Sequence, residues 1–354
     1  MTLLDLPSAR EEAWRWSDLS ALPALADAAP TGRVPDALPW IDCDGEGPRL
    51  LFVDGRLRSG EIEIGGLAVE TAHPLGRLAG REGWTLRLGR DRAPAGLVQI
   101  VHVSTGATDH LAAEILLDED AQASVVETFV GQGWTNRLTG IALGKGARLM
   151  LSRRVLGDGG FVSLTDAASL SQGASLVAAT LALGGRDTRL DGEIDLVGEG
   201  AYAEVSGALL ARARQRHDAN LVVRHLEPGG TSRQIWRSVA DGKATCSVAA
   251  RVEVARDAQK SDGEQSLKGL LLDRGATINA KPELEIFADD VKCAHGATVG
   301  ELDRNALFYL ESRGVEPDEA RGLLTCAFVA DAIDRIGEKA VREAFYRDAE
   351  GWFA

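Results

Sequence analysis

The stretch from Leu143 to Ala178 reads LGKGARLMLSRRVLGDGGFVSLTDAASLSQGASLVA, and it contains one short pattern twice. An apolar residue, two further residues, a turn-forming residue and Ala follow one another at Leu143–Ala147 and again at Leu170–Ala174. Glycine at the turn position accepts positive φ without steric cost, which is typical of a tight turn between short strands. The pattern therefore predicts a corner at which the chain changes direction.

This corner pattern recurs along the chain and indicates an internal repeat. It starts at Leu117, Leu143, Leu170, Val197 and Leu272. The first four starts lie 26, 27 and 27 residues apart, and the last lies 75 further on, near three repeats of 25. A second set of markers, Leu138, Leu164 and Leu190, keeps a step of 26. Two independent markers with one period predict a repetitive fold.

A repeat of this length has room for two or three short strands with tight turns. A βαβ unit would need a helix of about ten residues or more in every repeat, and none is visible. We therefore predict a parallel β-helix, in which stacked coils bury an inward row of side chains. The alternations Leu149, Leu151 and Leu176, Ala178 suit such a wall. Parallel crossovers are strongly right-handed, so a right-handed β-helix follows. An antiparallel sandwich remains the alternative.

Composition narrows the class of protein. The 354 residues carry a net charge of −14, which argues against a nucleic-acid partner or an anionic membrane surface. No apolar run approaches the ~18 residues of a membrane helix, and the N-terminus does not resemble a signal peptide. We expect a cytoplasmic protein whose four cysteines are reduced thiols.

Both ends of the chain are predicted to differ from the repetitive middle. Residues 1–48 read as an N-terminal helical segment, with a capping box from Ser8 to Glu11, followed by a proline-rich connection. Residues 49–299 form the β-helix core, and residues 300–354 form a C-terminal helical domain.

The C-terminal region shows a helix start at Glu316–Glu319, where Pro and acidic residues suit the first turn. We expect Gly337 to break this helix and a last short helix to run towards Tyr346. Such helices would cap the open end of the solenoid, whose edge strands must not stay exposed, or would dock a partner.

Motifs for catalysis are missing from the sequence. We find no phosphate-binding loop, no G-x-S-x-G elbow, no H-E-x-x-H and no pair of C-x-x-C motifs. The chain is therefore predicted not to be an enzyme of these classes.

Cys293 and His295 are the candidate metal ligands. In an extended segment residues i and i+2 lie on one face, so thiol and imidazole project together. Both are good ligands for soft or borderline metals, including iron in Fe-S clusters. Two ligands are too few for a tetrahedral site, which takes four, so something else must complete it, and a second protein chain is the natural supplier. The alternative is a buried Cys beside a hydrogen-bonded His.

Three segments carry a resemblance to a known family. LEIFADDVKCAHGATVGELDRNALFYLESRGVEPDEARGLLTCAF, at 284–328, strongly resembles the C-terminal signature of the SufB/SufD family of iron-sulfur cluster assembly proteins. AQKSDGEQSLKGLLL at 258–272 and EAWRWSDL at 12–19 are similar to further segments of it. The run HGATVG and Leu310 resemble the SufD branch more than the SufB branch. Because the Trp-rich motif begins almost at the N-terminus, we expect the longer N-terminal region of many members to be reduced here.

The resemblance implies a right-handed parallel β-helix and a non-catalytic role in the SUF scaffold. That scaffold combines one SufD-type subunit, one SufB and two copies of the ATPase SufC, which docks on the C-terminal helices, here 301–354. Nascent clusters form at the SufB/SufD interface, which assigns Cys293 and His295 to a transient iron or Fe-S site shared with SufB. No cofactor is expected to be tightly bound in the isolated chain, which could form a homodimer.

Three other roles stay open from the sequence. The chain could be a SufB-type subunit that carries the main cluster ligands. It could instead be a β-helix enzyme acting on polysaccharides, or an inert interaction scaffold in which Cys293 and His295 merely pack.

Overall fold

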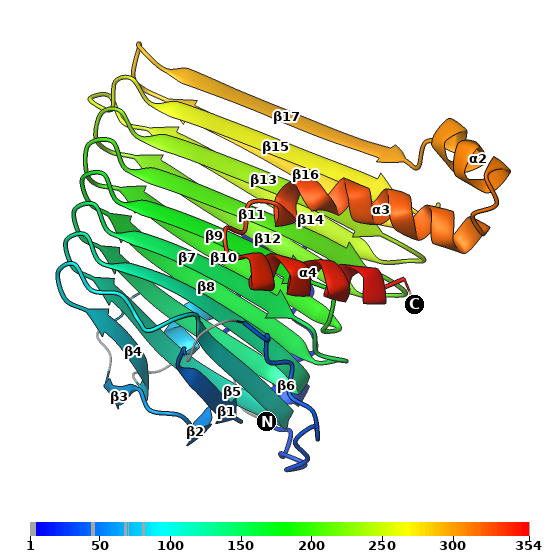
Figure 1. Cartoon of the computed structure of the whole chain (residues 1–354), viewed down its shortest axis with the longest axis horizontal. Helices are drawn as coiled ribbons and strands as arrows, with labels where there is room; N and C mark the ends of the chain where they lie inside the picture. The colour runs from blue at the N-terminus through cyan, green and yellow to red at the C-terminus, as the bar shows by residue number, and fades with distance from the viewer. Residues whose placement is uncertain (1–4, 44–46, 67–68, 70, 80–81, 354) are drawn as a thin grey trace.

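The computed structural model describes residues 5–43, 47–66, 69, 71–79 and 82–353. In this part of the chain the strands form a parallel β-solenoid of about 8 turns, with most helices near the C-terminus (Figure 1). The strand pairings are parallel except for β1 with β2 and β3 with β4. The parallel β-helix prediction is thus confirmed, and the antiparallel sandwich is wrong.

The elements have the following bounds. The strands are β1 (Arg49–Val53), β2 (Arg56–Ser59), β3 (Glu63–Gly66), β4 (Glu82–Leu88), β5 (Val98–Leu117), β6 (Gln122–Leu143), β7 (Arg148–Val155), β8 (Phe161–Leu170), β9 (Ser175–Ala182), β10 (Asp187–Leu196), β11 (Tyr202–Ala211), β12 (Arg216–His225), β13 (Thr231–Ala240), β14 (Thr245–Val254), β15 (Asp262–Leu271), β16 (Thr277–Ile286) and β17 (Lys292–Glu301). The helices are α1 (Leu22–Ala26), α2 (Arg304–Ser312), α3 (Pro317–Ile333) and α4 (Lys339–Gly351), with short 3₁₀ turns η1 (Glu12–Trp14) and η2 (Gly76–Ala79).

Two walls make up the solenoid beyond β6. The first wall contains β7, β9, β11, β13, β15 and β17, and the second contains β8, β10, β12, β14 and β16. Leu149 pairs with Leu176 in the first wall, and Leu164 pairs with Leu190 in the second; all four are buried in the core between the walls. The inward row predicted from their alternation is confirmed.

The coils become longer towards the C-terminus, whereas the sequence pattern predicted one constant repeat length. Paired residues are 26 apart at Gln122 and Arg148 but 32 apart at Thr245 and Thr277. Leu272 therefore does not continue the earlier corners: it follows β15 of the first wall, whereas the corners from Leu143 and Leu170 follow strands of the second wall. Its inclusion in the repeat was wrong.

The second marker was also wrong at one position. Leu138 pairs with Thr165, and Leu164 pairs with Arg137. Successive strand residues point to opposite faces, so a step of one residue moves Leu138 out of the inward row.

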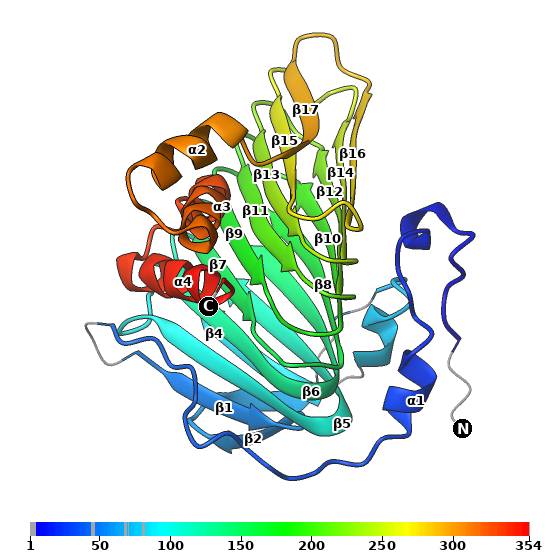
Figure 2. The ribbon, with the colours of Figure 1, turned by 90° about the vertical axis from the view of Figure 1, so that its right-hand side faces the viewer.

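The N-terminal segment lies along the second wall (Figure 2). Ser8 donates its backbone N–H to Glu11 Oε1 at 2.8 Å, one of the two bonds expected of a capping box. The helix that follows is a single 3₁₀ turn, which ends in the buried Trp14. The Arg189 guanidinium lies 4.4 Å from the centre of the Trp14 ring and fixes this turn to the wall.

The C-terminal helices cover the side of the solenoid and not its end (Figures 1 and 2). α3 begins at Pro317 after the N-cap Glu316, as predicted, but ends at Ile333, before Gly337. α4 continues beyond Tyr346 to Gly351.

The reason for this placement is an apolar outer face on the first wall. Outward residues such as Leu181, Leu210 and Val239 are buried in one cluster with Ile333 and Phe345 of the helices. Burying this face against α3 and α4 is favourable, and the prediction that the helices cap the end is wrong.

The strands run from Arg49 to Glu301, and α2 starts at Arg304. The division into domains at residues 48 and 299 stays a prediction. Among the helices of the described ranges, none combines the length and the apolar character that a membrane crossing requires.

Candidate metal site at the open end of the solenoid

The last coil of the solenoid is uncovered. β17 pairs with β15 and β16 pairs with β14, and neither strand has a pairing on its other edge within the described residues. Nearly all residues of β17 are exposed, and the apolar side chains Ile286, Phe287 and Val299 are 37%, 57% and 44% exposed. Open backbone groups and apolar side chains together make this end face a template for another strand.

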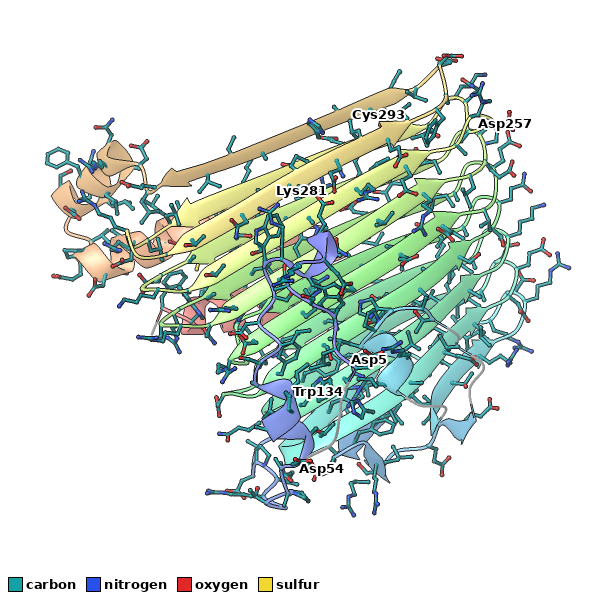
Figure 3. All side chains as sticks on the ribbon, turned by 180° about the vertical axis from the view of Figure 1, so that it is seen from behind. Asp5, Asp54, Trp134, Asp257, Lys281 and Cys293 are labelled. Atoms are coloured by element: carbon teal, nitrogen blue, oxygen red, sulfur yellow. The ribbon has the colours of Figure 1, made fainter. Side chains whose placement is uncertain are left out.

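Cys293 and His295 lie on β17 at this end face. Cys293 pairs with Gly263 of β15, and His295 pairs with Gln265, on the face that carries the core residue Leu267. Both candidate ligands therefore face the interior of the solenoid at its mouth, on one side of the strand, as extended geometry requires. Figure 3 shows Cys293 on this last strand. Their role as ligands stays a prediction.

The two side chains differ in environment. The Cys293 thiol is half-buried and packs against an apolar cluster that includes Val252 and Leu284, whereas His295 is exposed. Burial raises the pKa of the Cys293 thiol, and a backbone hydrogen bond from Gly263 partly opposes this. The thiol is therefore protonated at neutral pH, and metal binding has to displace its proton.

Around Cys293 and His295 the described residues add no further ligand cluster. Across the described ranges, no group of three or more His, Cys, Asp or Glu side chains is placed to hold a metal ion. The other cysteines lie elsewhere: Cys246 is fully buried in the core, Cys43 precedes β1, and Cys326 is in α3.

The interior below the two candidate ligands is polar, which the sequence did not predict. Ser232, Gln234 and Gln265 are 0%, 0% and 2% exposed, and they occupy the inward face of β13 and β15. Gln234 donates its side-chain N–H to the Arg251 carbonyl at 3.0 Å. Neither amide atom of Gln265 has a hydrogen-bond partner among the described residues. An unbonded buried polar group costs about 1–3 kcal/mol, so Gln265 calls for an explanation.

A second exposed surface lies on the C-terminal helices. Phe308 and Tyr309 of α2 are 73% and 58% exposed, and Leu323 of α3 is 51% exposed. Large apolar side chains that gather on helices beside a covered wall are typical of a protein contact surface.

Deep inside the first coils lies a buried network of charges. Arg137 forms an ion pair with Asp109, and Arg153 Nε lies 2.8 Å from Glu127 Oε2; all four side chains are buried. Burial alone would raise the pKa of Glu127, but the Arg153 guanidinium and His102 outweigh it and lower the pKa to about 2. Because each charge has a partner, this network is structural.

The fold and the end face define a class of protein: a β-solenoid with an open last coil, a Cys and a His on that coil, and helices on its flank. The family model described as "SUF system FeS cluster assembly, SufBD core domain" matches residues 101–328. The chain belongs to this SufBD family of iron-sulfur cluster assembly proteins, as the C-terminal signature predicted.

Three relatives show how similar this chain is to known proteins. The chain is 26% identical to the iron-sulfur cluster assembly protein SufD of Escherichia coli (strain K12), over 96% of this chain and 87% of that protein. It is 28% identical to the chloroplastic protein ABCI7 of Arabidopsis thaliana, over 67% of this chain. It is also 28% identical to a SufBD family protein of Synechocystis, over 63% of this chain. The chain spans about half the length of the last two relatives, 51% and 52%. Membership of this family argues against a polysaccharide-acting enzyme.

Proposed function

We propose that this chain is a non-catalytic scaffold subunit that pairs through its open end with SufB. Iron or a nascent Fe-S cluster is then held between Cys293, His295 and ligands of the partner. The single observation that carries this proposal is that the uncovered end strand β17 is also the strand that bears Cys293 and His295.

The end face suits pairing with another sheet. β17 has ten residues without proline, so a strand of about 33 Å offers its backbone to a partner strand. No heavy atom lies within 4 Å of where a Cβ would stand at Gly296 or Gly300, which leaves the backbone open to close approach. A second copy of this chain offers the same edge, which supports a homodimer in the absence of SufB.

A shared site explains the shortage of ligands. Cys293 and His295 supply two ligands, and a tetrahedral iron centre takes four, so the partner supplies the other two. Covering the end face also excludes water from the cargo, which keeps a nascent cluster from hydrolysis and oxidation. The cargo is transient, and it leaves when the two solenoids separate.

The C-terminal helices provide a second partner surface. We assign the exposed side chains Phe308, Tyr309 and Leu323, within 301–354, to the docking of the SufC ATPase. α3 and α4 are packed rigidly on the first wall, so a force exerted by SufC on them reaches the strands that lead to β17. ATP binding to SufC then opens the paired end faces.

The test is co-expression with SufB and SufC, anaerobic purification, and measurement of iron and acid-labile sulfide. His295→Ala and Cys293→Ala should leave the complex assembled but lower its iron and sulfide content. Thr298→Ala is the matched control, because Thr298 lies on the same strand but pairs with the exposed Lys268 on the other face.

Wild-type iron and sulfide in the double variant Cys293→Ala/His295→Ala would remove the ligand role. If the chain bound neither SufB nor SufC, the scaffold assignment itself would fail.

A further inference from the structure

The polar floor beneath β17 consists of the buried side chains Ser232, Gln234 and Gln265. Gln234, Gln265 and His295 pair in one inward row, from β13 through β15 to β17. One coil deeper the same row continues with Val205, which is buried in the apolar core. Along this row the side chains thus change from apolar to polar within the two coils that lead to the open end.

In the neighbouring row the Cys293 thiol packs closely over Gly263, where an added Cβ would also lie 3.3 Å from Val252 Cγ1. This row runs from Ser232 through Gly263 to Cys293. A Cβ built at Gly263 would lie 3.4 Å from Cys293 Sγ and 3.6 Å from Ser232 Oγ, so the thiol stands directly above a residue without a side chain. Ser232 already has a partner, because its Oγ lies 2.8 Å from His225 Nε2.

Gln265 is therefore the exception on this floor. Ser232 is hydrogen-bonded, and Gln234 donates one hydrogen bond although its Oε1 has no partner within the described residues. Both amide atoms of Gln265 have no partner there, although the side chain is 2% exposed. Neighbouring strands are about 4.8 Å apart, and a glutamine side chain bridges that distance to the residue above it. The residue above Gln265 is His295.

We propose that Gln265 is a positioning residue for His295, which rests on the proposed function of the end site. When a partner covers the end face, the imidazole turns inward and donates one ring N–H to the Gln265 carbonyl oxygen. That bond fixes the tautomer, so the other ring nitrogen presents its lone pair to iron. Removing such an outer hydrogen bond typically lowers metal affinity by about 10- to 100-fold.

The substitution Gln265→Leu separates this role from a structural one. It removes a buried amide that has no partner among the described residues, so thermal stability should be unchanged or slightly higher. Gln234→Leu is the matched control: it breaks the bond to the Arg251 carbonyl, so it should lower thermal stability and leave iron affinity unchanged. If Gln265→Leu fails to fold, Gln265→Met keeps the length of the side chain.

The measurement is anaerobic titration of the complex of this chain and SufB with Fe²⁺ alone, for wild type, Gln265→Leu, Gln234→Leu and His295→Ala. We expect a loss of affinity of about 10- to 100-fold for Gln265→Leu. In the complex, ¹⁵N NMR of the His295 ring should show one tautomer in wild type and a mixture in Gln265→Leu.

The outcomes are distinct. Wild-type affinity and a single tautomer in Gln265→Leu, with affinity lost in His295→Ala, would overturn the role of Gln265 and leave the proposed function intact. Wild-type affinity in His295→Ala would overturn the proposed function itself.

Discussion

His217 makes folding stability depend on pH in a calculable way. It lies at the start of β12, is 0% exposed, and pairs with Thr188 and Cys246 of the neighbouring coils. Burial lowers the pKa of the imidazole from 6.5 to about 4, and neither ring nitrogen has a hydrogen-bond partner among the described residues. The side chain is therefore neutral in the folded protein at all pH values above about 4.

The sign and the size follow from linkage. Between pH 6.5 and 4 the unfolded chain binds a proton at His217 that the folded chain does not, so stability falls as pH falls through this window. The full shift corresponds to about 3 kcal/mol, of which about 2 kcal/mol appears between pH 7 and pH 4.5.

The assay is urea denaturation of wild type and His217→Gln at pH 7 and pH 4.5. His217→Gln should lose about 2 kcal/mol less than wild type on acidification, whatever its stability at pH 7. Val248→Ala, at a buried core position, is the control: it should lower stability equally at both pH values. Equal losses in wild type and His217→Gln would refute the reasoning.

Two further substitutions test the packing of the coils. Gly207→Ala would place a Cβ 2.3 Å from the buried Trp236 ring and should lower the stability measured by thermal unfolding by about 1–3 kcal/mol. At the control position Gly89 no heavy atom lies within 4 Å of an added Cβ, so Gly89→Ala should change stability by no more than about 0.5 kcal/mol. A small effect of both substitutions would contradict the contact with Trp236. Arg137→Met leaves the buried Asp109 carboxylate without its guanidinium partner and should lower the free energy of unfolding in urea by about 3–5 kcal/mol. The double variant Arg137→Met/Asp109→Leu should recover part of this loss. No recovery would mean that the unpaired carboxylate does not cause the destabilisation.

The fold class could be predicted because corners and inward rows leave local signals. Leu149 and Leu176 occupy equivalent positions in two successive coils. Their spacing can be recognised in the sequence wherever successive coils have the same length. The i, i+2 geometry of Cys293 and His295 likewise follows from strand conformation alone.

The coil length near the C-terminus could not be predicted, because turns absorb extra residues without disturbing the strands. The link from β8 to β9 spans residues 171–174, whereas the link from β14 to β15 spans 255–261. This drift misplaced Leu272 and hid the row of Gln234 and Gln265, which are paired although 31 residues apart.

The position of the C-terminal helices also could not be predicted from the sequence. An apolar stripe on α3 shows that the helix is covered on one side but not by what. Leu210 and Val239 determine the position of the helices, because they make the outer face of the first wall apolar and α3 and α4 pack against it. The end face is left open as a consequence.

Hydrogen exchange of the end strands tests the central claim most directly. Amide exchange would be followed by mass spectrometry for the chain alone and in complex with SufB. A partner strand on the open end should protect the amides of β17 at 292–301, and cover those of β16 at 277–286, while the buried strand β11 stays unchanged. Unchanged exchange in β16 and β17, with protection elsewhere on the chain, would contradict the account.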